Sequence, residues 1–455
     1  MDRNFDKRLV ARIIIEAETP LVIASGNKNE LTDAEILRDV NGLPYIPGTS
    51  IAGVIRHAID AELADRFFGE DDSNNNPHGS EIIFSEAKIV DCDGKAIDGV
   101  KDSLSSFLDN YKKLPVRNHV RIGHKGVTEN AGKFDEEVIF KGTRFAFEVE
   151  MVAESSQEAP SAEDLMDRVL YELSCATFRI GGGTRKGFGK IKVVSILRKT
   201  FDLNSRDDMA EYLKLSSKLS EDREGWSPFK PSDEPSSDVI TYSLTLTPQD
   251  FFYFGSGVGD DDVDDTPVKE SIVQWENGKG KFKKDVLLIP ASSLKGAIAH
   301  RVAFHYNLAQ GIFAESTDEL ENHCGVNNPA VRRLFGYQDG DVQKRGCVIF
   351  NDILSDTSAE EKILNHVKID RFTGGAMDGA LFSEKVVNGK KLQLKTDISI
   401  VTSPDDVQED RNEATLEESL EAFEAALSDI NEGTLSLGGG NGRGHGVFRC
   451  EFSKK

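Results

Sequence analysis

The sequence is poor in residues that cross-link a chain or anchor it in a membrane. Its five cysteines, at positions 92, 175, 324, 347 and 450, form no C-x-x-C pair. An odd number of widely spaced cysteines argues against a disulfide framework and against a zinc ribbon. No apolar run approaches the ~20 residues that cross a bilayer, and the first residues lack the apolar stretch of a signal peptide. We therefore expect a soluble, cytoplasmic protein with no membrane partner.

The chain is also short of positive charge. Lys and Arg number 55 against 78 Asp and Glu, which gives a net charge of −23. A strongly negative surface repels a polyanion, so the composition argues against indiscriminate nucleic-acid binding but leaves room for a local basic track. The 455 residues suffice for two domains of about 200 residues each, large enough to bury cores without cross-links.

Five sequence blocks occur twice in the same order. The first pair is Ile46-Pro47-Gly48-Thr49-Ser50 and Ile289-Pro290-Ala291-Ser292-Ser293. The other pairs are 66–69 with 333–336, 82–84 with 348–350, 118–122 with 365–369, and the glycine-rich 181–187 with 438–444. A constant order with drifting loop lengths indicates a tandem duplication of one domain. We predict a first domain over 1–199, a polar linker over 200–238 and a second domain over 239–455.

Each repeat has the pattern of a β-α-β-β-α-β unit. An opening strand rich in β-branched residues, 8–16 or 239–247, precedes the Ile-Pro loop and an amphipathic helix. The expected N-caps of that helix are Thr49 or Ser50 and Ser292 or Ser293, and the later helix begins with a capping box at Ser161 or Thr415. The pattern predicts an α+β fold of two tandem ferredoxin-like (RRM-like) units, a type used in RNA recognition.

Three stretches break this compact pattern and are expected to project from the sheets. They are 91–117, 123–141 and 368–391, all rich in Gly, Lys and Asp. Long insertions of this composition are typical of functional or disordered loops. The last two occupy matching places in the two repeats, which favours a function.

Two loop types could bind phosphate. A helix N-terminus after an Ile-Pro loop offers free N–H groups and a positive dipole end, although ordinary N-capping is the alternative. The second copy, with Lys295 in its first turn, favours phosphate contact. The glycine loops lack the G-K-[Ser/Thr] ending and the strand-to-helix order of a P-loop, so an NTPase is not indicated. One interpretation is that these loops are flexible turns. The other is that their glycines let the backbone come close to a ligand, which would be contacted by Arg179, Arg185, Lys186 and Arg443.

Carboxylates stand before both Ile-Pro loops. Asp33 lies in the first repeat, and Asp260, Asp261, Asp262, Asp264 and Asp265 crowd the same place in the second. Such a loop is either simply solvated or holds a hydrated metal ion at an RNA-binding face. His119 and His366 are equivalent in the two repeats; packing is one interpretation and a role as a base is the other.

Together these blocks resemble the RAMP superfamily, specifically the backbone subunits of type III CRISPR effector complexes. The resemblance rests on residues 42–50, on the glycine loops, and on 367–376 with 379–382, which look like the thumb hairpin of that family. The duplication is similar to the fused double backbone subunits of type III-D and related systems.

The resemblance implies a subunit that binds CRISPR guide RNA, inserts its thumbs between guide and target, and cleaves target RNA beside each displaced nucleotide. The implied partners are guide RNA, target RNA, other RAMP subunits and a large polymerase-like subunit. The implied catalytic residues are Asp33 and Asp265, with magnesium held by Asp33, Asp264 and Asp265. The thumbs would act through Phe134, Phe372 and Met377. The expected RNA contacts are Thr49, Ser50, Arg56, Arg179, Arg185, Lys186, Ser292, Ser293, Lys295, Lys368, Arg371 and Arg443. The alternative function is a catalytically inactive RNA-binding scaffold.

Overall fold

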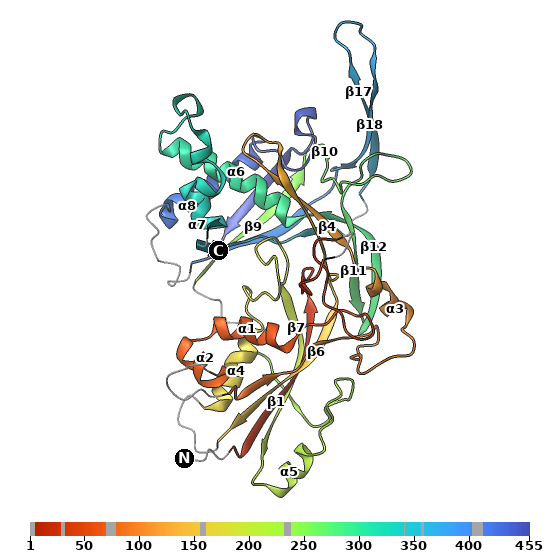
Figure 1. Cartoon of the computed structure of the whole chain (residues 1–455), viewed down its shortest axis with the longest axis vertical. Coiled ribbons are helices and arrows are strands. Elements are labelled where there is room, and N and C mark those ends of the chain that lie inside the picture. The colour runs from red at the N-terminus through yellow and green to blue at the C-terminus, as the bar shows by residue number, and fades with distance from the viewer. Residues whose placement is uncertain are drawn as a thin grey trace.

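A computed structural model describes residues 5–28, 32–69, 79–154, 161–231, 238–340, 342–355, 359–402 and 413–455. Figure 1 shows two α+β bodies stacked along the long axis, with a long hairpin projecting beyond the upper one. Two large clusters of buried apolar residues form the cores, one in each sequence repeat. The α+β class predicted from the element pattern is confirmed.

The sheet of the first repeat is built around β1 (Lys7–Ala17). This strand pairs antiparallel with β6 (Arg144–Ala153) on one side and with β7 (Ile191–Asp202) on the other. The strands β2 (Ile82–Phe84) and β3 (Lys88–Ile89) extend the β6 edge, giving the order β2-β6-β1-β7. The helices of this repeat are α1 (Gly48–Ala58), α2 (Ala61–Phe68), α3 (Ser106–Asp109), η1 (Asn110–Lys112) and α4 (Ala162–Glu172).

The second repeat reproduces this order. Its central strand β9 (Val239–Pro248) lies between β19 (Leu394–Val401) and β20 (Phe448–Lys454), and β15 (Val348–Ile349) continues beyond β19. Its main helices are α6 (Ala291–Ala309), α7 (Pro329–Phe335) and α8 (Leu416–Asn431). Shorter elements are β10 (Phe251–Phe252), η2 (Ala314–Ser316), η3 (Leu320–His323), η4 (Gly325–Asn327), β13 (Gly336–Asp339), β14 (Val342–Arg345), β16 (Ile353–Ser355) and η6 (Asn441–Arg443).

Local sequence signals explain where several of these helices begin. The capping boxes predicted at Ser161 and Thr415 are both present at the starts of α4 and α8. The caps of α1 and α6 differ from the prediction, because Pro47 and Pro290 are the N-caps and the Ser and Thr side chains lie inside the first turn. Proline restricts its own φ to about −65°, and the chain enters both helices directly after it, two or three residues earlier than hydroxyl capping would place the start.

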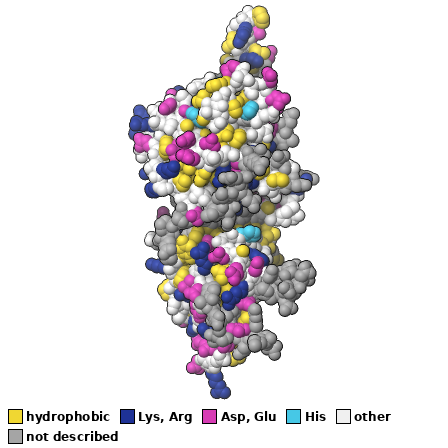
Figure 2. All heavy atoms as spheres, turned by 90° about the vertical axis from the view of Figure 1, so that its left-hand side faces the viewer, with side chains coloured by type: hydrophobic (Ala, Val, Ile, Leu, Met, Phe, Trp, Pro, Cys, Tyr) yellow, Lys and Arg dark blue, Asp and Glu magenta, His cyan; other side chains and the backbone are white. Residues whose placement is uncertain are grey.

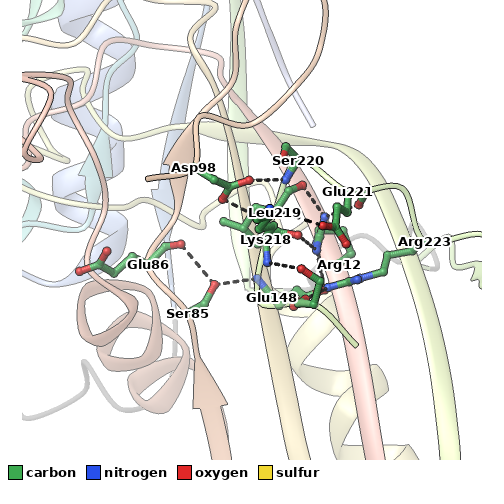
Figure 3. Close-up of polar contacts among 11 residues, drawn as sticks. Arg12, Ser85, Glu86, Asp98, Glu148, Lys218, Leu219, Ser220, Glu221 and Arg223 are labelled. Carbon is green, nitrogen blue, oxygen red and sulfur yellow. Dashed lines mark hydrogen bonds and ion pairs between the residues drawn. The ribbon is translucent and has the colours of Figure 1, made fainter. Parts of the chain in front are cut away.

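Much of the predicted linker packs on the first repeat. Its described part contains α5 (Arg206–Tyr212) and β8 (Ser227–Pro228), which pairs with β7, while residues 232–237 lie outside the described residues. Figure 3 shows Arg12 of β1 donating to the carbonyl oxygens of Lys218 and Glu221. Glu148 accepts from both Arg12 and Arg223, so one carboxylate holds two cations under this segment. Polar composition alone did not indicate this packing.

Two hairpins occupy the places of the predicted projecting insertions. Thumb 1 consists of β4 (Val116–Ile122) and β5 (Thr128–Glu137), and thumb 2 consists of β17 (Glu361–Ile369) and β18 (Ala376–Asn388). Figure 1 shows thumb 2 extending away from the upper body. The third insertion, 91–117, differs from the prediction because Phe107, Leu108 and Tyr111 are buried in the first core.

A further hairpin joins the two repeats. The strands β11 (Lys269–Glu276) and β12 (Lys279–Ile289) belong to the second repeat, yet Val273 lies in the first core with Trp275 and Phe282 packed against it. We call this hairpin the clasp. The Phe282 ring contacts the rings of Phe107, Tyr111 and Phe140 at centroid distances of 5.0 to 5.5 Å. The clasp therefore buries aromatic surface across the contact between the two repeats, which we call the joint.

A buried ion triplet lies beside the clasp. Arg117 of β4 donates to both carboxylate oxygens of Glu270 in β11, and its Nη1 lies 2.7 Å from Oδ2 of Asp352. All three side chains are at most 6% exposed. Burial opposes the charge on Arg117, but the two carboxylates more than offset it and raise its pKa. Because removal of one partner leaves the others charged and buried, breaking the triplet to separate the repeats is costly.

We predict that Arg117→Met lowers the free energy of unfolding by about 3–5 kcal/mol, the usual cost of breaking a buried ion pair. Urea denaturation followed by circular dichroism measures this effect. Arg56→Met is the matched control, since Arg56 pairs with Asp65 on the surface and such pairs contribute about 0–1 kcal/mol. Equal effects of the two substitutions would contradict the assignment of the triplet as the joint.

Candidate active site and RNA interface

The loop that carries Asp33 is bound to the root of thumb 1. The backbone N–H of Asp33 donates to Oδ1 of Asp135 at 2.8 Å, and the N–H of Asp135 donates to Oδ2 of Asp33 at 3.1 Å. The next residues, Ala34 and Glu136, form a parallel bridge. Asp33 is exposed, so one carboxylate oxygen stays available to a ligand while the other is fixed by the thumb.

The same contact in the second repeat involves Asp264. The N–H and hydroxyl of Ser383 donate to Oδ2 of Asp264 at 2.8 and 2.9 Å, and these hydrogen bonds lower the pKa of its carboxyl group. Asp265 and Glu384 form the parallel bridge that corresponds to Ala34 and Glu136. The structural equivalent of Asp33 is therefore Asp264, and Ser383 stands where the first repeat has Asp135.

In this register Asp265, the residue chosen from the sequence, is the counterpart of Ala34 and not of Asp33. Its Oδ1 accepts from the N–H groups of Gly257 and Thr266 at 3.2 and 2.9 Å. Burial, followed by the nearby carboxylate of Asp265, raises the pKa of Tyr253. Asp265 thus holds its own loop together. The neighbouring Asp260 is likewise engaged, because it accepts from the N–H groups of Asp262 and Val263 and pairs with Lys385.

Each thumb root also carries a histidine, a buried glutamate and a phenylalanine. His119 lies 2.9 Å from Glu136 and stacks on Phe134 at a centroid distance of 6.3 Å. His366 lies 3.0 Å from Glu384 and stacks on Phe382 at 6.2 Å. The histidines are therefore cross-strand neighbours in the hairpins, and both interpretations of them, packing and acid–base chemistry, remain predictions. Four residues at these roots were not predicted from the sequence: Asp135, Glu136, Ser383 and Glu384. A signal for them exists, because Phe134-Asp135-Glu136 and Phe382-Ser383-Glu384 form a sixth repeated block.

The donor set fits a hydrated magnesium ion better than a protein-only metal cage. No group of three His, Cys, Asp or Glu side chains suited to a metal occurs among the described residues. Mg²⁺ commonly takes one or two carboxylates and completes its shell with water and substrate phosphate oxygens. Asp33 with Asp135 could supply two such carboxylates and Asp264 one. Asp265 is committed to backbone N–H groups, so it is the poorest of the three predicted metal ligands.

Two lysines converge where the repeats meet. Lys295, the fifth residue of α6, is half-buried, and desolvation followed by the charges of Lys186 and Arg185 lowers its pKa to about 8. Lys186 lies with its Nζ 5.9 Å from the ring centroid of Phe134. Neither lysine forms an ion pair with any residue that the structure describes. A cation that is desolvated among other cations favours an anionic ligand, so this place suits an RNA phosphate.

Four of the other ten predicted RNA contacts, all of them arginines, have protein partners in the structure. Arg179 is 5% exposed and donates to the carbonyls of Ala176 and Phe178 and to Asn351, and burial lowers its pKa to about 10. Arg185 donates to the carbonyl of Gly346, Arg56 pairs with Asp65, and Arg443 binds Glu384 through two hydrogen bonds of 2.8 and 2.6 Å. These arginines hold the protein together, a role that sequence reasoning could not separate from ligand binding.

The two helix N-termini also differ from the predicted anion sites. The N–H of Ala291 donates to Oδ1 of Asp352 at 2.8 Å, so a buried carboxylate already lies at the positive end of α6. At α1, a side chain on Gly48 would collide with the carbonyl of Phe84, which lies against the helix start. Ser50 and Ser292 are partly buried, while Thr49 and Ser293 are exposed. Phosphate contact by these four residues stays a prediction.

The predicted thumb residues occupy different levels of the hairpins. Phe372 lies in the turn of thumb 2 with its side chain 99% exposed, and Met377 lies close to it at 40%. Lys368 and Arg371 flank this apolar tip and are exposed. Phe134 is not at the tip of thumb 1, because it pairs with His119 nearer the root. Thumb 1 instead ends over α6, where the carbonyl of Ile122 lies 3.2 Å from Nε2 of His300.

Figure 2 shows acidic and basic side chains intermingled on one face of the molecule. No helix within the described ranges has the length and apolar character required to span a membrane.

Comparison with known proteins gives the family. A model described as "RAMP superfamily" matches residues 14–192 and 250–449, so the chain belongs to the RAMP superfamily and contains two copies of its characteristic domain. The chain is similar to the CRISPR system Cms endoribonuclease Csm3 of Methanocaldococcus jannaschii, with 27% identity over 213 residues that cover 41% of this chain and 78% of the relative. A chain of the type III-B Cmr-beta complex, solved by cryo-electron microscopy in the apo state, is 17% identical. That match covers 40% of this chain and 96% of the solved one, with a TM-score of 0.31.

We predict that RNA affinity falls as the pH rises above about 8, because the phosphate contact needs protonated Lys295, whose pKa in the free protein is about 8. A bound anion raises that pKa, so affinity is constant below the free-protein value and declines above it. Fluorescence anisotropy with a single-stranded RNA measures this profile. Lys295→Arg should flatten it, since arginine stays charged. An unchanged profile in the variant would contradict the assignment.

Proposed function

We propose that this protein is a guide-RNA-binding backbone subunit of a type III CRISPR effector complex that cleaves complementary target RNA at two places, one per repeat. The observation that carries the proposal is the recurrence of one contact, a loop aspartate bound to the root of a thumb hairpin, in both copies of a RAMP domain. The endoribonuclease activity named for the similar Csm3 protein supports the reaction type. The implied partners are guide RNA, target RNA and the other subunits of such a complex.

We further propose that each repeat is a ferredoxin-like unit. In both repeats the first sheet strand in chain order is a central strand. The third and fourth strands in chain order lie on either side of it, and the second lies at the edge beyond the third. This is the order expected when a β-α-β-β-α-β chain folds with its two halves interleaved. In that arrangement the thumb is an insertion between the second and third strands, and the aspartate loop lies between the first strand and the first helix.

The contacts suggest a separate role for each group of residues in RNA binding and cleavage. Lys186 and Lys295 would hold phosphates of the RNA at the joint, and each thumb would separate one nucleotide of the target from the guide. The aspartate loop is bound to that thumb, so the carboxylate of Asp33 or Asp264 would face the linkage next to the displaced nucleotide. A bound magnesium ion would supply charge neutralisation at the phosphate and an activated water. The protein would contribute orientation, with Asp135 or Ser383 fixing the carboxylate.

The alternative is an RNA-binding scaffold without cleavage. It is favoured by the second repeat, where Ser383 replaces Asp135 and offers a hydroxyl in place of a second carboxylate. A repeat with a single acidic ligand holds magnesium less well, so loss of activity is more plausible there than in the first repeat. The two functions differ in one measurable outcome, which is scission of a matched target RNA.

In the assembled complex with magnesium, Asp33→Ala should abolish one cut and Asp264→Ala the other, each by about 10²–10⁴-fold, with guide binding unchanged. The reason is that both carboxylates are exposed at the thumb roots, away from Lys186 and Lys295, to which we assign the phosphates of the RNA. Denaturing gels of end-labelled target RNA measure each cut separately. Asp262→Ala is the matched control, since Asp262 is an exposed aspartate of the same loop. Two cuts that persist in both variants would favour the scaffold.

Phe372→Ser should blur or weaken the cut assigned to the second repeat and leave the first cut sharp. An apolar side chain can wedge between stacked bases at a cost of a few kcal/mol per step, offset by contacts along the strand, whereas serine cannot. Primer extension at nucleotide resolution reports the sharpness of both cuts. Val342→Ser, at an exposed position of β14 away from the thumb, controls for surface polarity. Unaltered cutting by the Phe372 variant would remove the thumb from the mechanism.

A further inference from the structure

The two repeats contact each other through different surfaces. The first contributes its thumb root, its glycine loop and the turn before β6, through Arg117, Arg185 and Gly142. The second contributes the clasp, the start of α6 and the loop after β15, through Val273, Ala291 and Asp352. An interface of this head-to-tail kind can in principle repeat without end, because each unit keeps one unused surface. Some feature of the chain must therefore prevent further copies from adding to the unused surfaces.

The first repeat has no clasp to offer to a preceding copy. In the second repeat β11 and β12 stand between the aspartate loop and the Ile-Pro motif. At the corresponding place in the described residues 32–69, the first repeat makes a tight turn in which the N–H of Asp39 donates to the carbonyl of Leu43 at 2.7 Å. The aromatic surface that enters the first core through Trp275 and Phe282 has no counterpart there.

The second repeat lacks the receptor for a clasp. The clasp approaches the first repeat at Gly142, whose φ is +84°, and a Cβ added at Gly142 would lie 1.9 Å from the carbonyl oxygen of Val273. The equivalent residue is Lys391, with a φ of +72°. The equivalence follows from the turns, in which the next residues, Thr143 and Leu392, donate to carbonyls three positions back at 3.2 and 3.1 Å. The second repeat therefore carries a lysine side chain at the position where docking of a clasp requires glycine.

The polar contacts of the joint are missing from the second repeat as well. Counting from the paired His119 and His366, the position of Arg117 is occupied by Leu364, which cannot bind two carboxylates. Counting from the paired glycine loops, the places of Arg179 and Arg185 are taken by Ser436 and Gly442. If the clasp of another copy left its own first repeat and docked here, its Glu270 and Asp352 would lose Arg117 and be buried without a cation, which is strongly unfavourable.

We propose that the joint between the repeats forms only within one chain, and that the free face of the second repeat rejects another copy of this protein. That face fits instead a different protein that presents a short turn where this chain has the clasp, with an uncharged surface opposite Leu364. The consequence is a closed two-repeat unit of fixed length, whose neighbours on either side must be other chains. This inference concerns assembly and holds whether or not the aspartate loops cleave RNA.

Two measurements on the full chain test the proposal. Sedimentation velocity over a wide concentration range should show a monomer throughout. Gly142→Lys, which places the residue of the second repeat in the receptor of the first, should displace the clasp and increase the quenching of Trp275 by iodide. Gly126→Lys is the matched control, because that glycine also has a positive φ, +71°, with open space around its Cβ.

Either of two results would overturn the proposal. One is self-association of the natural chain with cross-links that join residues 269–289 of one copy to residues 390–393 of another. The other is a Gly142→Lys variant that protects Trp275 as fully as the Gly126→Lys control does, since a lysine would then be compatible with a docked clasp.

Discussion

The guanidinium group of Arg117, buried between Glu270 and Asp352, is the contact on which the rest of the structure depends. It ties the root of thumb 1 to the clasp of the second repeat, and Asp352 in turn accepts the first N–H of α6. This one charge cluster thereby positions thumb 1, the joint between the repeats and the N-terminus of α6. Since α6 carries Lys295 and thumb 1 carries Phe134, the same cluster fixes the place where we propose that RNA crosses from one repeat to the next.

The two candidate sites share a plan and differ in detail. Both bind an exposed aspartate to a thumb root beside a histidine and a buried glutamate. In the second repeat Glu384 is neutralised by Arg443, whereas the residue equivalent to Arg443 is Lys186, which points over Phe134. Among the described residues, the first site therefore has a lysine without an ion-pair partner, to which we assign a phosphate of the RNA, and a second carboxylate, Asp135. Duplication preserved the geometry while the surrounding charges diverged.

Sequence reasoning reached the fold through features that are local or repeated. The capping boxes at Ser161 and Thr415, the paired Ile-Pro motifs and the glycine loops predicted the helices, their order and the duplication. It failed where a residue's role depends on a partner distant in the chain. Asp265 and Asp264 are neighbours in sequence, and only the bridge to Glu384 separates them. Arg179 and Arg443 are similarly engaged by groups that no local pattern reveals.

The central claim is that two equivalent sites sit at a fixed separation on one rigid chain. Mapping every scission in a matched target RNA, at nucleotide resolution and for several guide sequences, tests it most directly. The account predicts two cuts whose spacing stays constant and whose positions follow the register of the guide, because the joint fixes the distance between the thumb roots. Cuts that follow the target sequence, or a spacing that varies between guides, would contradict it.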